Sequence, residues 1–224
     1  MLAKTFGSAV HGVDARTILI EVNVGQGTRF FMSGLPDNAL KESQLRIESA
    51  LKNWEYFMPR KRTVVNLAPA DIRKEGSAYD LPIALCILEA SEQITTNKLE
   101  KFMIMGELAL DGVLRPIKGV LPIAIHAQRE GFKGLIVPEA NAREAAVVDG
   151  LDVFPVKTLP QAISFLQDDQ QIAPLKLDAR EIFKAHANAY DTDFKDVQGQ
   201  ENIKRALEIA AAGGHNVIMI GPPG

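Results

Sequence analysis

The chain has 224 residues, a formal net charge of −3 at pH 7, 46% hydrophobic residues and 24% charged residues. These values are typical of a globular protein. The net charge excludes a protein that binds nucleic acid through its overall charge, but it does not exclude a local basic patch. The single cysteine, Cys86, excludes an internal disulfide framework, and its apolar neighbours favour a buried core thiol.

The N-terminal third of the chain predicts two strands and a helix. Residues 16–25 alternate apolar and polar side chains, and residues 28–36 form a second strand-like run after a "GQG" turn signal. A helix follows, for which Asp37 or Asn38 is the candidate N-cap. We expect its apolar side to consist of Leu40, Leu45, Ile47, Leu51 and Trp54.

Helices and strands then alternate up to about residue 168. A strand is expected at 63–67, followed by a central helix that is apolar almost all round. A strand and a short return strand surround an Asp111-Gly112 hairpin turn. The later elements are expected at 120–132 (helix), 134–138 (strand), 139–148 (helix), 152–156 (strand) and 158–167 (helix). This order predicts an α/β fold with a mixed (α+β) sheet, in one domain spanning residues 1–168.

The remaining residues predict a linker and the start of a second unit. Residues 169–190 are polar with weak periodicity, so they are predicted to be a linker with a short helix at 179–187. Residues 191–224 contain an expected helix at 202–212, ended by two glycines, and an apolar strand at 217–220. The chain closes on "GPPG", in which Gly221 could be the first glycine of a P-loop.

The order of elements in residues 191–224 resembles the entry to an AAA+ ATPase module of the magnesium-chelatase-like branch. "DVQGQ", an alanine-rich helix, a Gly-Gly break, an apolar strand and "GPPG" carry this resemblance, against the simpler reading of a turn after a strand. It implies ATP and Mg²⁺ as ligands, with an adenine segment and a partial phosphate loop at Val197, Gly199, Gln200, Gly221, Pro222, Pro223 and Gly224. Because the second glycine, the lysine and the hydroxyl residue are absent, we expect a fragment of a longer ATPase with no bound nucleotide.

The body of the chain resembles the proteolytic domain of Lon-type proteases. "APADIRKEGSAYDLPIAL" and "MGELALDGVLRPIKGVLPIAIHAQREGFKGLIVPEANAREA" carry the resemblance, which implies a ribosomal-protein-S5-domain-2-like fold and a serine–lysine dyad. The match places the nucleophile position at Ala78 and the base position at Leu121. Neither side chain can attack a carbonyl or accept a proton, so this domain is expected to be non-catalytic.

Two neighbouring residues leave a protease alternative open. Ser77 and Lys118 could form a displaced dyad, although a one-residue shift at a helix start rotates a side chain by ~100°. The competing interpretation of Ser77 is a helix N-cap, which Asp80 could provide equally. Glu107 is either a buried acid held by the turn or part of a functional surface.

Together the two resemblances identify the bacterial YifB/ComM family along all 224 residues. This resemblance implies a hexameric AAA+ ATPase that acts on DNA in recombination, natural transformation and branch migration, and it does not imply porphyrin chelation. A cytoplasmic location is expected separately, because the N-terminus "MLAKTFGSAVHG" lacks the apolar h-region of a signal peptide. Residues 1–168 would then serve substrate engagement or hexamer organisation. The alternatives are an active Lon-type serine protease that uses Ser77 and Lys118, and a purely structural oligomerisation domain.

DNA is the expected partner of the full-length protein, and Arg60, Lys61 and Arg62 are the candidate contacts. A solvated loop before a strand is the alternative, and the run Phe30–Met32 is interpreted as core rather than as a base-stacking platform. Further basic residues could join the patch: Arg46, Lys52, Arg73 and Lys74. No apolar stretch approaches the ~20 residues that cross a bilayer, and the four histidines lack metal-ligand spacing, so neither membrane nor metal is expected.

Overall fold

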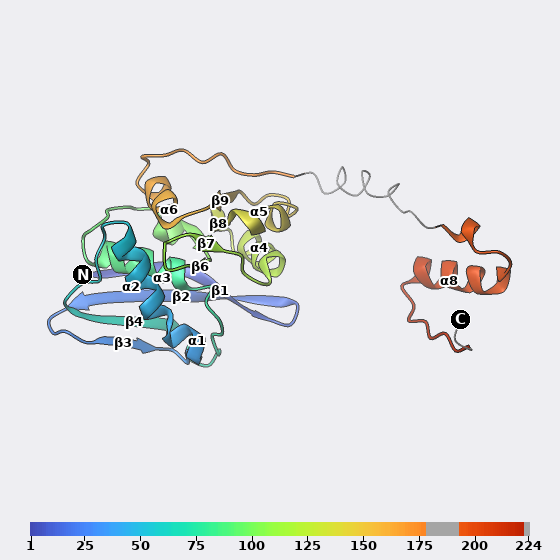
Figure 1. Ribbon diagram of the computed structural model, residues 1–224, viewed down its shortest axis with the longest axis horizontal. Coiled ribbons are helices and arrows are strands. Elements are labelled where there is room, and N and C mark those ends of the chain that lie inside the picture. The colour runs from blue at the N-terminus through green and yellow to red at the C-terminus, as the bar shows by residue number, and fades with distance from the viewer. Residues whose placement is uncertain (178–192, 222–224) are drawn as a thin grey trace. The chain divides into compact units, whose positions relative to one another are not determined.

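The computed structural model describes residues 1–177 and 193–221 (Figure 1). Two compact units divide the chain, Met1–Ala179 and Arg180–Gly224, and they are described separately. The predicted helix at 179–187 lies outside the described residues, as do Pro222, Pro223 and Gly224.

The first unit is built on a seven-stranded mixed sheet, which confirms the predicted α/β class. Its strands lie in the order β3-β4-β2-β1-β5-β8-β9, with β3 and β9 at the edges (Figure 1). In chain order they are β1 (Leu2–His11), β2 (Asp14–Gly25), β3 (Phe30–Ser33), β4 (Arg62–Ala68), β5 (Phe102–Ile104), β8 (Gly134–Pro138) and β9 (Val153–Val156). The pairs β1–β2 and β2–β4 are antiparallel, whereas β3–β4, β1–β5, β5–β8 and β8–β9 are parallel.

The first strand, β1, is missing from the sequence-based prediction. It forms a long hairpin with β2 through Gly12, whose φ of 64° suits a tight turn. Strand β2 shows the expected alternation, since Ile18, Ile20 and Val22 are fully buried. Strand β1 has small and polar side chains instead, such as Ser8, and therefore lacks an apolar period that sequence reasoning could detect.

The "GQG" link does not join two paired strands, as its turn signal had suggested. Strand β3 pairs in parallel with β4, and β4 lies between β3 and β2. The chain therefore crosses over instead of forming a hairpin. Gly27 has a φ of 115°, and a β-carbon there would approach the β-carbon of Arg62 to 3.1 Å.

The expected helix after Pro36 is present but broken into α1 (Asn38–Lys41) and α2 (Ser43–Asn53). Asp37 is its N-cap, accepting a 2.7 Å hydrogen bond from the amide of Leu40. Leu45 is 67% exposed, so the prediction that it packs in the core is wrong. It lies in the same helix as the buried Ile47 but two residues away, which is about 200° of rotation around the helix.

The central helix α3 (Asp80–Ala90) is buried on nearly all its residues, as the sequence predicts. It packs on the face of β1 and β2 that carries Ile18 and Ile20, whereas α4 covers part of the opposite face. The remaining elements are η1 (Leu99–Lys101), the hairpin β6 (Glu107–Leu108) and β7 (Leu114–Arg115), and helices α4 (Val120–Arg129), α5 (Glu139–Ala145) and α6 (Leu159–Leu166).

Residues 169–177, expected to begin the linker, continue along the first unit. The amide of Leu175 donates to the carbonyl of Val153 at 2.8 Å, and the amide of Leu177 donates to that of Ala146 at 3.4 Å. These backbone bonds anchor the segment to β9 and to the end of α5.

The described part of the second unit consists of η2 (Phe194–Asp196), α8 (Glu201–Gly213) and an extended tail. The helix matches the prediction, and Gly214 ends it with a φ of 63°. The expected buried strand at 217–220 is wrong for the described residues, because no strand is assigned there and Ile220 is 91% exposed. A strand needs a neighbouring strand, and this unit contributes none among its described residues.

Candidate functional site

The two positions that the Lon resemblance assigns to the dyad lie at the starts of helices. Ala78 precedes α3, where its carbonyl accepts the amide of Gly106 at 2.8 Å. Leu121 lies in the first turn of α4, is 37% exposed, and donates its amide to the Glu144 carboxylate at 3.1 Å. The backbone places both positions as helix-start sites, while their side chains offer only carbon.

Ser77 does not cap α3. The N-cap is Tyr79, which makes no side-chain capping bond, so the N-cap interpretation is wrong for both Ser77 and Asp80. The Ser77 hydroxyl instead donates to the carboxylate of Glu107 on β6. The hydrogen-bond acceptor of the Ser77 hydroxyl is therefore a carboxylate, whereas a Lon-type dyad uses the amine of a lysine.

Lys118 is solvent-exposed in the loop before α4, and within the described residues it makes no hydrogen bond or ion pair. The loop itself is fixed by Asn141, which bonds the amide and the carbonyl of Ile117 at 2.9 Å each. The described residues therefore show no hydrogen bond between Ser77 and Lys118.

Asp80 forms an ion pair with Arg46, and its own side chain is buried. Its carboxylate is fully buried and accepts two hydrogen bonds from Arg46, at 2.7 and 3.0 Å, and one from the amide of Leu108, at 3.3 Å. Burial raises the pKa of Asp80 to about 6, with the hydrogen bonds from Arg46 acting in the opposite direction. Arg46 is therefore a structural partner of helix α3, and its suggested role in a DNA-binding patch stays a prediction.

Glu107 contacts two partners and is partly exposed. Its side chain is 24% exposed, and Arg115, opposite it on β7, approaches it at 3.7 Å. Of the two interpretations left open, the structure favours an acid held at the base of the β6–β7 turn. Sequence reasoning missed this cluster because its members come from four separate segments.

Lys74 is buried rather than available to DNA. Its ammonium group donates to the carbonyl of Gly34 at 2.8 Å and to the carbonyl of Pro69. Burial lowers the pKa of Lys74. The amine thereby joins the loop after β3 to the loop after β4, and the suggestion that it contacts DNA is wrong.

The basic run at 60–62 is exposed where β4 begins. Arg60 and Lys61 lie in the preceding loop, and the Arg62 guanidinium lies 5.3 Å from the ring centroid of Phe31. Phe31 is 43% exposed, whereas Phe30 and Met32 pack partly buried against the core. The core interpretation of this run therefore holds for two of its three residues.

The predicted nucleotide residues are only partly described. Gly199 and Gln200 adopt positive φ angles of 68° and 60° directly before α8. Val197 is 45% exposed, and among the described residues no hydrogen bond joins the 193–200 segment to residues 215–221. Their assembly around a nucleotide remains a prediction.

No metal-binding group emerges from the described residues, where three or more histidine, cysteine or acidic side chains never converge on one point. Among the helices in residues 1–177 and 193–221, none combines the length and the apolar character that a membrane crossing requires.

Two family models match this chain. The model for subunit ChlI of Mg-chelatase covers residues 20–141, and the model for magnesium chelatase, subunit ChlI, covers residues 193–224. Together they extend from within β2 to within α5 and over most of the second unit.

Several curated proteins are similar along the whole chain. Competence protein ComM of Haemophilus influenzae is 42% identical over 100% of this chain, and YifB of Escherichia coli is 42% identical over 96% of it. The chain spans 44% and 42% of the lengths of these two proteins. The archaeal Lon protease of Methanocaldococcus jannaschii is 33% identical over 94 residues, which are 42% of this chain and 14% of that protein. The mixed α/β fold of the first unit is thus Lon-like.

Proposed function

Because the chain belongs to the YifB/ComM family of magnesium-chelatase-like AAA+ proteins, we propose that it is the non-catalytic N-terminal part of an ATP-dependent DNA-processing protein. The observation that carries the non-catalytic role is the pair of carbon side chains, Ala78 and Leu121, at the positions of the Lon dyad. The Ser77 hydroxyl, directed to Glu107, supports it.

ATP and Mg²⁺ belong to this proposal only for the complete protein. The "GPPG" segment contains two prolines, which have no N–H group, so it cannot by itself surround a phosphate with backbone donors. A bound nucleotide with Mg²⁺ would supply the free energy of phosphate-bond hydrolysis. The residues present here would contribute only the adenine-side segment and the first glycine of the loop.

The DNA role draws on the name of one relative, a competence protein, and on the exposed basic residues before β4. Within such a protein the first unit would engage the substrate or organise a hexamer. It has its own core of buried side chains, which suits a domain that keeps its shape while an attached motor moves.

The test uses the complete protein that contains this chain. We expect the complete protein to hydrolyse ATP, and forked DNA to stimulate this hydrolysis more than linear duplex DNA does. We also expect it to migrate a branched DNA junction only when ATP is present. A complete protein that hydrolyses ATP but is indifferent to every DNA form would overturn the DNA-processing proposal. If the complete protein forms hexamers and its first unit does not contact DNA, the first unit has a purely structural role in oligomerisation.

Protease activity provides an independent check. We expect no labelling of Ser77 by a fluorophosphonate probe and no release of peptides from fluorescent casein by the complete protein, because no lysine activates the hydroxyl. Ser77→Ala is the matched control, since any genuine labelling must disappear in it. Casein cleavage that Ser77→Ala abolishes would establish the Lon-type protease instead.

A further inference from the structure

One end of the sheet carries a solvent-exposed face that the helices leave uncovered. The register of β3, β4, β2 and β1 places alternate residues of these strands on the same side, away from the buried row of Ile20, Val22 and Val65. Helix α4 covers the other end of this side, where Thr17 contacts His126 at 2.9 Å. We call the uncovered part the open sheet face, and its residues are Leu2, Lys4, Glu21, Asn23, Phe31, Ser33, Arg62, Val64 and Asn66.

A row of polar side chains crosses all four strands of the open sheet face. The Ser33 hydroxyl donates to the Asn66 side-chain oxygen at 2.9 Å, and the Asn66 amide donates to the Glu21 carboxylate at 3.1 Å. Lys4 completes the row with an ion pair to Glu21 at 3.3 Å. These bonds hold donors and acceptors in fixed positions at a surface that still reaches solvent, and they neutralise the carboxylate.

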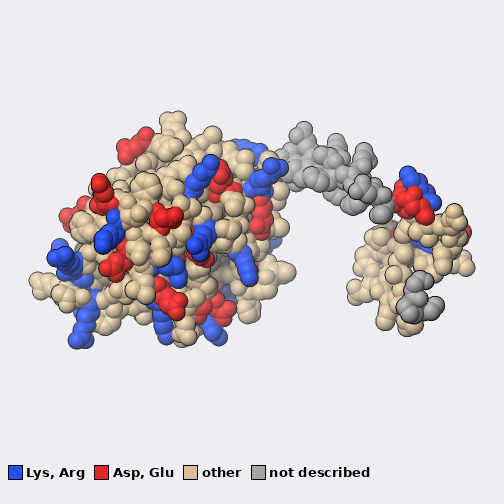
Figure 2. Space-filling view, viewed as in Figure 1, with Lys and Arg blue, Asp and Glu red and all other residues tan. Residues whose placement is uncertain are grey.

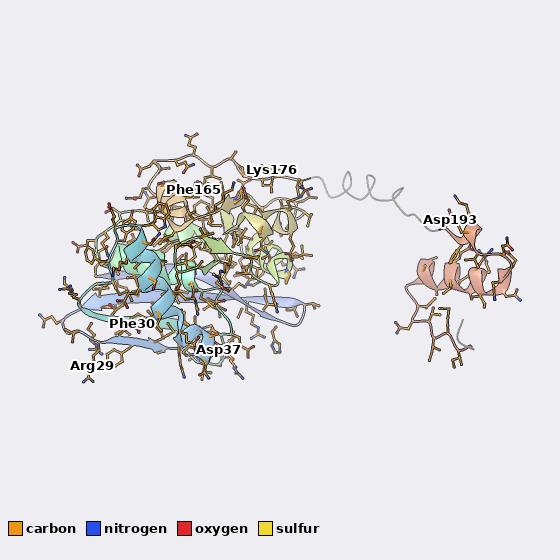
Figure 3. All side chains as sticks on the ribbon, viewed as in Figure 1. Arg29, Phe30, Asp37, Phe165, Lys176 and Asp193 are labelled. Atoms are coloured by element: carbon orange, nitrogen blue, oxygen red, sulfur yellow. The ribbon has the colours of Figure 1, made fainter. Side chains whose placement is uncertain are left out.

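An aromatic ring and several cations lie beside this row. Phe31 is 43% exposed, and the Arg62 guanidinium lies 5.3 Å from its ring centroid. The exposed Arg29, Arg60 and Lys61 lie next to the starts of β3 and β4. Figure 3 shows Arg29 beside Phe30 at the lower edge of the first unit, and Figure 2 shows lysine and arginine side chains along that edge.

We propose that the open sheet face binds single-stranded DNA, with a base stacked on Phe31 and phosphates held by Arg29, Arg60, Lys61 and Arg62. The inference rests on the proposed DNA role and names the form of DNA that this surface takes. Every base has a π-face that can stack on an exposed aromatic ring, and the surrounding cations match the phosphate charge. The row of Ser33, Asn66 and Glu21 offers hydrogen-bond partners to base edges.

A duplex suits this surface less well. Its bases are stacked inside, and its grooves are read by a projecting helix, ribbon or arm. The open sheet face is formed by paired strands and presents side chains rather than a projecting element. Single-stranded bases can spread over such a surface, which gives the sheet a preference for unpaired DNA.

The test measures fluorescence anisotropy of the 224-residue chain with a labelled oligothymidylate of about 20 nucleotides, with an oligouridylate of the same length and with the matching blunt duplex. We expect tighter binding of the single strand, about tenfold weaker binding for Phe31→Ala, and near-normal binding for Phe31→Tyr. Phe57→Ala is the matched control, because Phe57 is 60% exposed and lies outside the open sheet face. Replacing Arg60 and Lys61 by alanine should also reduce the salt dependence of binding.

Equal binding of duplex and single strand, tighter binding of an oligouridylate, or a Phe31→Ala affinity equal to that of Phe57→Ala would overturn the proposal. Thermal melting of each variant verifies that it folds. If the complete protein processes branched DNA and Phe31→Ala does not weaken binding of the single strand, the open sheet face is not the binding surface, and the proposed function stands. If the open sheet face binds single strands but the complete protein does not respond to DNA, the binding surface stands and the proposed function fails.

Discussion

Replacing Arg46 by methionine is expected to lower the free energy of unfolding of the first unit by about 3 to 5 kcal/mol at pH 7. Asp80 is fully buried, and Arg46 supplies two of its three hydrogen bonds. Methionine keeps much of the volume of arginine but leaves the carboxylate without a countercharge. Chemical denaturation followed by circular dichroism measures the loss.

The loss should depend on pH in a defined direction. The folded-state pKa of Asp80 is about 6, above the ordinary value of 3.8, so its folded form takes up a proton first as the pH falls. The stability that this proton uptake provides is complete below the ordinary value and is lost as the pH rises through about 6. Without Arg46 the folded-state pKa of Asp80 rises further, so the pH range over which proton uptake stabilises the fold extends to higher pH. The deficit of Arg46→Met should therefore shrink between pH 8 and pH 5.

Two controls sharpen this expectation. Arg46→Met combined with Asp80→Asn removes the buried charge and should recover part of the stability at pH 8. Arg73→Met removes an exposed ion pair with Glu75 and should change little. A deficit for Arg46→Met that stays constant from pH 5 to pH 8 would contradict a coupling to the protonation of Asp80.

The parts of the fold that local patterns encode were predictable. Helix α3 is apolar all round because it is buried, and the Asp111-Gly112 turn forms the β6–β7 hairpin as expected. Strand β1 escaped prediction because a strand at the centre of a sheet can be held by its neighbours without an apolar period of its own. The parallel pairing of β3 with β4 is a non-local choice that a turn signal at residues 25–27 cannot reveal.

The candidate site likewise has a part that the sequence could predict and a part that only the structure shows. Resemblance to a known domain placed Ala78 and Leu121 at the dyad positions, and the structure locates both at helix starts. The Arg46–Asp80 and Ser77–Glu107 contacts join residues about 30 positions apart, so only the folded chain brings them together. Only the structure shows that Phe31 is exposed whereas Phe30 packs against the core. The two differ because adjacent residues of a strand point to opposite faces of the sheet.

Substituting alanine for Gly34 is expected to destabilise the first unit by at least about 3 kcal/mol or to prevent its folding. Gly34 has a φ of 97°, and a β-carbon there would lie 2.0 Å from the carbonyl oxygen of Leu67, in the backbone of β4. Relief requires the loop after β3 to move, which also withdraws the Gly34 carbonyl from the buried ammonium group of Lys74. The free energy of unfolding, measured by chemical denaturation, reports the combined cost.

Gly12→Ala separates backbone strain from this collision. Gly12 has a φ of 64°, and no atom lies within 4 Å of a β-carbon built there, so alanine should cost only about 1 to 2 kcal/mol. If Gly34→Ala were no more destabilising than Gly12→Ala, the contact with Leu67 would not restrict this position. A clearly larger loss would show that the close approach of Gly34 to the Leu67 carbonyl restricts this position beyond the backbone conformation that alanine disfavours.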